Sequence, residues 1–492
     1  MRRRARVGQW GDQPLRAMRW WPVTLLAVVV VLCGGAAAMW LLGVWSPIPA
    51  AVPDPQRLRL DRIKTGLTVT AGLAAALTLL MTLRRQAWSE HAQQFTQADA
   101  IEQRITALYV AAAEQLGSSK AAVRLAGLYA LERLGQDNPK LRRTVMEVFC
   151  AYLRMPFVPP VEVLLENTEG SPQHVVPDAD MPEPEEQQQQ RREELQVRLT
   201  AQRLIAHHLH IPDKPGDPEP ATYWRGAAGE QMSLDLTGAT LVSFNLSSCH
   251  AAQFHAGSAQ FHGNAELIGA HFHGGVRLRR AQFHHNADLS SAQFHGHTDL
   301  SAAQFYRHAI LRETQFHGEA NLRAAEFHGD AQLGGVQFHG YAYLFAAQFH
   351  SADLIKAQFH GDANLGGSQF HGRADLSGAQ FHGSTELSVA QFHRHARLSS
   401  VQFHGHVRLS HAEFHGDADL RAKFAGRVEI AALWVTPTAL LPPGWALAGD
   451  ADYANVKDEL RRVVRSGGEA SGESVGRDEA AADVYSSGED AT

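Results

Sequence analysis

An eleven-residue repeat fills the chain from about Phe254 to Phe424 and limits the possible folds more than any other feature. Most copies read Ala-Gln-Phe-His-Gly-x-Ala-Asp-Leu-Ser-x, so a leucine follows each phenylalanine by six residues. A fixed short period over so many copies indicates a solenoid, in which each unit buries its apolar side against its neighbours. The spacing slips to ten residues between Phe349 and Phe359, which predicts a local irregularity between Phe349 and Leu354.

Two repeats make a coil of about 22 residues, which returns phenylalanine above phenylalanine and leucine above leucine. Strands in neighbouring coils should lie about 4.8 Å apart, so some eight coils would span roughly 40 Å. Each phenylalanine would stack on its copy in the next coil. The small residue two positions earlier, usually alanine, leaves room for the ring.

Residues 374–383 read Ala-Asp-Leu-Ser-Gly followed by Ala-Gln-Phe-His-Gly, which resembles the pentapeptide-repeat family with its unit A-[DN]-L-x-x. The resemblance covers roughly residues 233–430. It implies a right-handed, four-sided β-solenoid (a quadrilateral β-helix), with the central residue and the one two before it pointing inward. The order of parts along the whole chain also resembles membrane-anchored pentapeptide-repeat proteins of the actinobacterial type.

The chain departs from the family pattern by one extra residue between each phenylalanine-centred and leucine-centred unit, as at Glu319, Asp362 and Arg373. This residue lengthens the coil from the family's 20 residues to about 22. It usually follows a glycine, which predicts a loose corner with a positive φ at that glycine.

Histidine follows fifteen of the seventeen repeat phenylalanines, and 22 of the 28 histidines lie between Phe254 and Phe424. On a 22-residue coil these side chains should form two ladders, which could share a metal ion or titrate together near pH 6. An inherited neutral surface residue is the simpler interpretation, since no cysteine or carboxylate stands beside each histidine at the spacing of a closed metal site. The candidate metal ligands are His262, His284, His317, His339, His371 and His393.

Composition argues against several classes of protein. The array between Phe254 and Phe424 has 14 acidic and 13 basic residues, and the whole chain has a net charge of −6. A duplex-DNA mimic that binds a topoisomerase needs a much more acidic face, and no nucleic-acid partner is expected. Repeated histidines without unequal partners make no acid–base pair, so we expect neither an enzyme nor a cofactor. Three distant cysteines suggest no disulfide framework.

The amino-terminal part predicts a transmembrane helical hairpin within residues 22–85. After a basic tail, residues 1–21, Pro22–Trp45 is an uncharged apolar run, and Gly66–Leu83 is a second. A cleaved signal peptide is the alternative for the first run, with Ala36 to Ala38 as a cleavage site. The excess of basic residues in the tail predicts a cytoplasmic amino end. Two spans would then leave the repeat domain in the cytoplasm, at the cell membrane.

The remaining segments follow from pattern and composition. Residues 86–157 show helical spacing, with Gly135 as a helix end and Asn138-Pro139 as the start of another helix. Residues 158–190 are acidic and glutamine-rich and predict a disordered linker. An amphipathic helix and amino-terminal cap, 191–232, should precede the solenoid, 233–430. A carboxy-terminal cap, 431–465, and a disordered acidic tail, 466–492, should follow it.

These features favour a non-enzymatic scaffold, tethered to a membrane, that binds an unidentified protein partner. A metal- or pH-responsive histidine module is the main alternative, and a topoisomerase-binding DNA mimic is a weaker one. Whether the array also forms a homodimer through its end is left open by the sequence.

Overall fold

The computed structural model describes residues 55–166, 184–212, 219–448 and 460–465, together with a few residues between 28 and 40. The chain divides into two compact units, Met1–Thr106 and Ala107–Thr492. The predicted basic tail, 1–21, the centre of the predicted linker, 167–183, and the predicted acidic tail, 466–492, lie outside the described residues.

Helix α2 (Pro55–Leu116) begins in the first unit, ends in the second, and runs without a break through Gly66–Leu83. In the part of the chain that the structure describes, no helix combines the length and the apolarity needed to cross a membrane. The structure therefore does not support the predicted hairpin within 22–85. Its first run, Pro22–Trp45, lies almost wholly outside the described residues.

The second unit starts with a small helical bundle. It contains α3 (Ala121–Asp137), the 3₁₀ helix η1 (Pro139–Leu141), α4 (Arg142–Arg154), α5 (Val161–Glu166) and α6 (Glu185–Leu209). Helices α3, α4 and α6 pack against one another around Leu131, Phe149 and Ile205, which are all fully buried. Helix α6 begins inside the predicted linker, 158–190, because its Glu- and Gln-rich start consists of good helix formers.

Two predicted helix signals have other roles. Gly135 does not end α3, which continues to Asp137; a Cβ at Gly135 would lie 2.6 Å from the ring of Trp224, so the glycine makes room for the indole. Asn138 does not cap the following helix with its side chain. Its Nδ2 donates instead to the carbonyl of Leu134 at the end of α3, at 3.0 Å.

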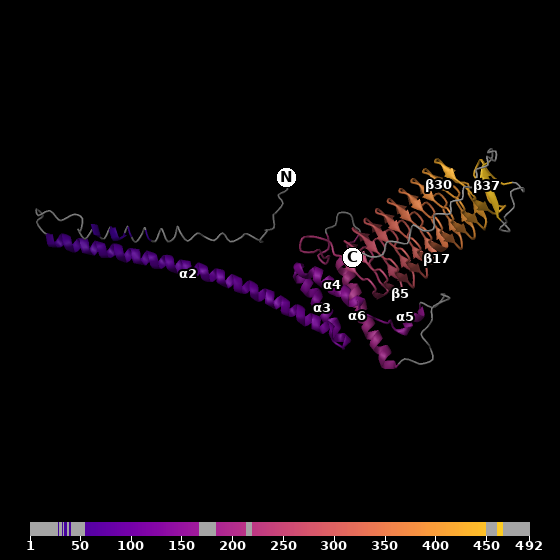
Figure 1. Ribbon diagram of the computed structural model, residues 1–492. Helices are drawn as coiled ribbons and strands as arrows, with labels where there is room; N and C mark the ends of the chain where they lie inside the picture. Colours follow the sequence, from indigo (N-terminus) through magenta and orange to yellow (C-terminus); the bar gives the residue numbers. More distant parts are fainter. Residues whose placement is uncertain are drawn as a thin grey trace, which may run out of the picture. The chain divides into compact units, whose positions relative to one another are not determined.

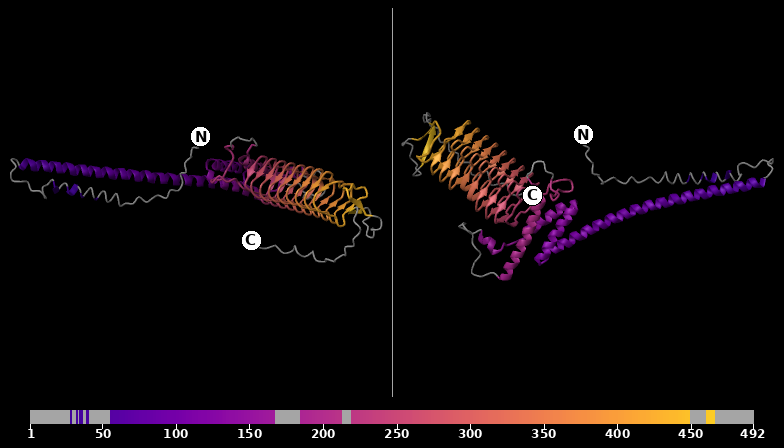
Figure 2. Two further views of the ribbon diagram at one scale, coloured as in Figure 1. Left: turned by 90° about the horizontal axis from the view of Figure 1, so that it is seen from above. Right: turned by 180° about the vertical axis from the view of Figure 1, so that it is seen from behind.

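Each coil of the array contains four short parallel strands, and 22 residues separate most positions from their copies, as from Phe283 to Phe305. We number the four faces by the strands of one coil. Gln282–Phe283 lies on face 1, Ala287–Asp288 on face 2, Gln293–Phe294 on face 3 and Thr298–Asp299 on face 4. Face 3 alone has nine strands, so the predicted β-solenoid is confirmed with about one coil more than expected (Figures 1 and 2).

The strands of each face follow in chain order. Face 1 contains β2 (Thr240–Val242), β5 (Gln260–His262), β9 (Gln282–Phe283), β13 (Gln304–Phe305), β17 (Glu326–Gln332), β20 (Gln348–Asp353), β23 (Gln369–Phe370), β27 (Gln391–Phe392), β31 (Glu413–Phe414) and β35 (Trp434–Val435). Face 2 contains β6 (Ala265–Glu266), β10 (Ala287–Asp288), β14 (Ala309–Ile310), the ends of β17 and β20, β24 (Ala374–Asp375), β28 (Ala396–Arg397) and β32 (Ala418–Asp419). Face 3 contains β3 (His250–Ala251), β7 (His271–Phe272), β11 (Gln293–Phe294), β15 (Gln315–Phe316), β18 (Gln337–Phe338), β21 (Gln358–Phe359), β25 (Gln380–Phe381), β29 (Gln402–Phe403) and β33 (Lys423–Phe424). Face 4 contains β1 (Leu234–Asp235), β4 (Phe254–His255), β8 (Val276–Arg277), β12 (Thr298–Asp299), β16 (Ala320–Asn321), β19 (Ala342–Tyr343), β22 (Ala363–Asn364), β26 (Thr385–Glu386), β30 (Val407–Arg408) and β34 (Val428–Glu429).

Two columns of stacked phenylalanines fill the core. Ring centroids lie 4.4–5.0 Å apart on face 1 and 4.5–5.4 Å apart on face 3. The repeat leucines and alanines are buried beside them, as predicted. Each fully buried phenylalanine contributes about 1.5–3 kcal/mol, so the stack is the main stabilising element of the array.

Positive φ angles occur at the corner after nearly every repeat leucine, whereas of the glycines that follow Phe-His in the array only Gly263 (φ 72°) has the predicted positive φ. Ser291 (φ 56°), Lys356 (φ 57°) and Val389 (φ 62°) occupy the third position of tight turns at that corner. In the turn at Ser291 the N–H of Ala292 donates to the carbonyl of Leu289 at 3.1 Å, as in a type II turn.

The glycine after Phe-His has a packing role on face 3. A Cβ at Gly318 would lie 2.4 Å from the carbonyl oxygen of Gly296, closer than side chains approach backbone. The same overlap recurs from coil to coil, so glycine is required at this corner because the backbones stack directly. The column contains Gly274, Gly296, Gly318, Gly340, Gly361, Gly383, Gly405 and Gly426.

The predicted irregularity between Phe349 and Leu354 is confirmed. Strands β17 and β20 continue around the corner from face 1 to face 2, and their register shifts between Phe327 and Asp330. Phe327 pairs with Phe349, whereas Asp330 pairs with Ser351, so the coil at β20 lacks one residue. This continuous pair joins faces 1 and 2 into one sheet.

Both ends of the array are covered. At the amino end the Gln202 side chain on α6 donates to the carbonyl of Val242 (2.8 Å) and accepts from its N–H (3.3 Å), replacing a missing strand. At the carboxyl end β36 (Trp445–Leu447) and β37 (Arg461–Arg465) pair antiparallel, and Trp445 stacks on Phe424 at 5.4 Å. Helices and strands thus close the ends where caps were expected.

Candidate functional site

Histidines on face 3 form an unbroken outward ladder. Adjacent rings lie 4.7–5.4 Å apart and within 11° of parallel. The ladder contains His273, His295, His317, His339, His360, His382 and His404. On face 1 the ladder is interrupted, since Tyr306 stacks between His284 and His328.

The six predicted metal candidates form three stacked pairs. Their ring centroids lie 4.5 Å apart for His262 and His284, 4.9 Å for His317 and His339, and 5.1 Å for His371 and His393. Parallel stacked imidazoles direct their nitrogen lone pairs in parallel, so two neighbouring rings do not converge on one ion. Among the described residues, no group of three or more His, Cys, Asp or Glu side chains could hold a metal ion.

The environment of the ladder favours neutral imidazoles. Burial, followed by repulsion from protonated His360 and His317, lowers the pKa of His339 below its usual value. Burial and the two neighbouring rungs lower the pKa of His295 and His382 in the same way. Protonation of a neighbouring rung therefore opposes protonation of His295, His339 and His382.

A hollow of about 240 Å³ opens on face 2, where the coil lacks one residue. Side chains of both charges surround it, and small residues form part of its wall. Its principal polar lining comes from Arg312, Asp330, Ser351, Asp353, Arg373 and Asp375. The break in the repeat after Phe349 therefore coincides with a concave, charged site.

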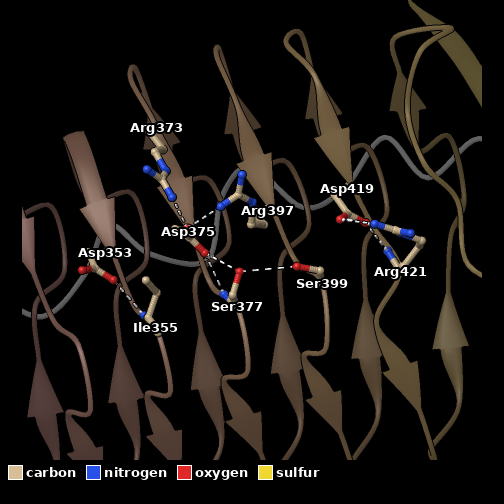
Figure 3. Close-up of polar contacts among 9 residues, drawn as sticks. All are labelled: Asp353, Ile355, Arg373, Asp375, Ser377, Arg397, Ser399, Asp419 and Arg421. Atoms are coloured by element: carbon tan, nitrogen blue, oxygen red, sulfur yellow. Dashed lines mark hydrogen bonds and ion pairs between the residues drawn. The ribbon is translucent and has the colours of Figure 1, made fainter.

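Asp375 anchors an ion-pair network beside the hollow (Figure 3). Only 3% of its side chain is exposed, and it pairs with Arg373 and, at 3.4 Å, with Arg397. Ser377 donates to it through its hydroxyl (2.5 Å) and its N–H (3.0 Å). Burial alone would raise the pKa of Asp375, but the Ser377 and Arg373 hydrogen bonds outweigh it and keep that pKa below its usual value.

Neighbouring coils repeat parts of this arrangement. Arg421 donates to both oxygens of Asp419 at 2.8 Å, and the Asp353 carboxylate accepts the N–H of Ile355 at 3.0 Å (Figure 3). Asp353 differs from Asp375 and Asp419, because no arginine pairs with it among the described residues. Faces with alternating arginines and carboxylates do not form the continuous acidic surface of a DNA mimic.

One coil presents three aromatic side chains on face 4. Tyr341, Tyr343 and Phe345 alternate with inward Ala342 and Leu344, so all three point outward. The tyrosine rings lie 3.9 Å apart, and Phe345 is 41% exposed. We call these three residues the aromatic coil.

Polar groups border the aromatic coil in the adjacent coils. The Arg323 guanidinium lies 5.7 Å from the centroid of the Phe345 ring. On the other side, Asp362 and Glu386 contribute to a raised pKa of Tyr341, behind the larger effects of burial and of Tyr343. In the next coil Gly366 and Gly367 have no side chains that could cover Phe345, which stays exposed to solvent.

Three segments of the array, residues 256–304, 344–391 and 376–422, match the family profile of pentapeptide repeats (9 copies). These segments of the array are pentapeptide repeats. No curated protein and no solved structure matches the chain. Since every matched segment lies within the array, the match gives no support to the membrane-anchored actinobacterial type.

Neither of the two cysteines that the structure describes is suited to nucleophilic catalysis. Cys150 and Cys249 are free and buried, and burial raises the pKa of each thiol to about 12. A thiolate is the reactive form, so neither side chain is an activated nucleophile.

Sequence reasoning missed both the hollow and the aromatic coil. The aromatic coil had a visible signal, because Tyr341, Tyr343 and Phe345 replace the polar outward residues of the consensus at three alternate positions. The shortened spacing after Phe349 marked the position of the hollow but not its lining. Arg312 and Arg373 come from coils before and after the contraction and are brought to it by stacking.

Proposed function

We propose that this chain is a non-enzymatic interaction scaffold whose pentapeptide-repeat array binds a basic segment of a partner protein at the aromatic coil. The aromatic coil is the observation that supports this most directly. Aromatic side chains and arginine are enriched at the centres of protein interfaces, with a polar rim around them. The capped array supplies a rigid surface with little ordering cost on binding.

The charge around the aromatic coil favours a basic partner. Glu319 and Asp362 border it in the two adjacent coils, against the positive charge of Arg323, whereas Glu386, one coil further, pairs with Arg408 at 3.4 Å. A lysine or arginine can sit over an aromatic face, which is worth about 0.5–2 kcal/mol. Arg323 over Phe345 is an internal example of this contact.

Tethering to a membrane is part of the proposal and rests on the sequence. The apolar run Pro22–Trp45 has the length of a span, and six arginines precede it. The basic flank favours a cytoplasmic amino end and, with two spans, a cytoplasmic array. Extraction of cell membranes with carbonate should leave the wild-type chain in the pellet and release a chain lacking 22–45. Release of both chains would remove this part of the proposal.

The partner proposal is tested with designed peptides of one length, (Gly-Ser-Lys)₄, (Gly-Ser-Arg)₄ and (Gly-Ser-Glu)₄, in fluorescence anisotropy. The full chain should bind the two basic peptides, more weakly at higher salt, and not the acidic one. The triple variant Tyr341→Ser, Tyr343→Asn, Phe345→Ser gives this coil the residue types found at the same positions of later coils, Ser384, Asn364 and Ser388. It adds no charge and should weaken binding at least tenfold.

A matched control changes the same face elsewhere. Ser388→Ala with Ser410→Ala alters two outward positions of later coils and should leave binding unchanged. Equal binding of acidic and basic peptides, or unchanged binding by the triple variant, would refute the proposal.

A further inference from the structure

The hollow on face 2 is a distinct site, on a different face from the aromatic coil. It lies beside the stretch of β20 from Phe349 to Asp353, which has one residue fewer than the same stretch of its neighbours. At the contraction a Cβ on Gly372 would lie 2.2 Å from the carbonyl oxygen of His350, so successive backbones approach there as closely as in the glycine column of face 3.

Size limits what the hollow can hold. About 240 Å³ is the space of roughly eight water molecules at about 30 Å³ each. A ligand of on the order of ten non-hydrogen atoms would fill it. The hollow thus suits a small polar metabolite or a single side chain and is too small for a nucleotide.

The charged side chains that line the hollow limit the class of ligand further. Arg312 makes no side-chain hydrogen bond or ion pair among the described residues. The carboxylate of Asp353 accepts one hydrogen bond from them, from the N–H of Ile355. Arg373 and Asp375 are occupied with each other. Asp330 lies 3.6 Å from the Nδ1 of His308. The hollow therefore offers Arg312 as its available cation, and Asp353 as a carboxylate with no cationic partner among the described residues.

A ligand of a single sign fits this lining poorly. An anion that reaches Arg312 meets the carboxylates of Asp330 and Asp353, while a cation at Asp353 meets Arg312 and Arg373. A ligand that has both charges pairs with Arg312 and with Asp353 at the same time. Ile355 adds an apolar contact for the carbon skeleton.

We propose that this hollow binds a small zwitterion with the chemistry of a free amino acid, its carboxylate toward Arg312 and its ammonium group toward Asp353. The site is open and makes few contacts, so dissociation constants of about 0.1–10 mM are expected. The proposal does not depend on the proposed partner, because the aromatic coil lies on face 4.

The test follows the Ile355 methyl signal by NMR in the full chain, with Ile268 as a reference. Ile268 occupies the same position after a repeat leucine in another coil. L-glutamine, about ten non-hydrogen atoms in size, should shift Ile355 saturably and leave Ile268 in place. Glutarate and cadaverine carry one sign of charge each and should bind at least tenfold more weakly.

Two variants separate binding from folding. Asp353→Asn keeps the shape of the side chain and should weaken L-glutamine binding at least tenfold. Insertion of one glycine between His350 and Ser351 restores the Phe-His-Gly-x corner, closes the hollow and should abolish the shift without lowering the melting temperature. An Ile355 signal that is unmoved by 50 mM L-glutamine, or that moves equally with glutarate, would overturn the proposal. So would full binding by the insertion variant.

Discussion

Substitution of Gly318 by alanine tests whether the glycine column is set by coil stacking. The added Cβ would lie 2.4 Å from the carbonyl oxygen of Gly296 and 2.6 Å from its carbonyl carbon. The obstacle is backbone and not the end of a flexible side chain, so the coils must move apart by several tenths of an ångström. Overpacking of this kind costs about 1–3 kcal/mol, and we expect the upper part of that range.

Gly275→Ala is the matched control, because its Cβ would meet nothing closer than the carbonyl of His297 at 3.7 Å. It should be neutral or stabilise by up to about 1 kcal/mol through the unfolded chain. For a unit of this size, about 2–3 kcal/mol lowers the melting temperature by roughly 4–12 °C. Differential scanning calorimetry of the two full-length variants gives this difference directly.

Hydrogen exchange locates the effect. The N–H of His339 donates to the carbonyl of Phe316 at 2.8 Å across the coil boundary next to Gly318. If local opening becomes easier by about 2–3 kcal/mol, exchange there should accelerate roughly 30- to 150-fold in Gly318→Ala alone. Melting temperatures within 2 °C of each other, with equal exchange, would show that the glycine column is inherited and has no packing role.

Three further predictions follow from the array and its amino-terminal cap. His295, His339 and His382 of the ladder have folded pKa values below the unfolded value. The stability that these three groups contribute is complete above about pH 6.5 and is lost as pH falls through the folded values. The melting temperature should therefore fall from pH 7.5 to pH 5, less steeply in His339→Gln, and an equal pH slope in both chains would contradict this. Gln202→Leu leaves the N–H and carbonyl of Val242 unsatisfied, which should cost about 1–3 kcal/mol and speed exchange at that end, whereas unchanged exchange would exclude the capping role. Cys150 and Cys249 should resist iodoacetamide at pH 8 until the chain is unfolded in urea, and rapid native labelling would show that they are not buried.

The core of the array could be predicted because one residue pattern determines both its period and its packing. Phe, Leu and Ala recur at fixed offsets, so any stacked arrangement must place each on its own copy. The shortened spacing after Phe349 was also informative, since a missing residue must appear as a register shift. These inferences need only the regularity of the backbone.

The role of the corner glycines could not be read in the same way. Glycine is selected both where φ is positive and where backbones approach closely, and a single sequence does not separate the two reasons. The structure does: φ is positive at Ser291, Lys356 and Val389, which are not glycines. Gly318 is required by the backbone of the coil before it, which lies 22 residues away in the chain.

The candidate sites could be predicted only in part, because the residues common to all repeats are easier to recognise than the residues that are specific to one repeat. The histidine ladders are the most frequent outward feature, yet their parallel rings form no convergent set of ligands. The aromatic coil lies in the turn of the solenoid between Phe338 and Phe359, and the contraction beside the hollow lies in the same turn. A residue change that is found in one repeat and not in its copies is not explained by the stacking of the coils. The glycine insertion after His350 should therefore remove the hollow and leave basic-peptide binding at Tyr341 intact. Loss of both would show that the contraction also positions the aromatic coil.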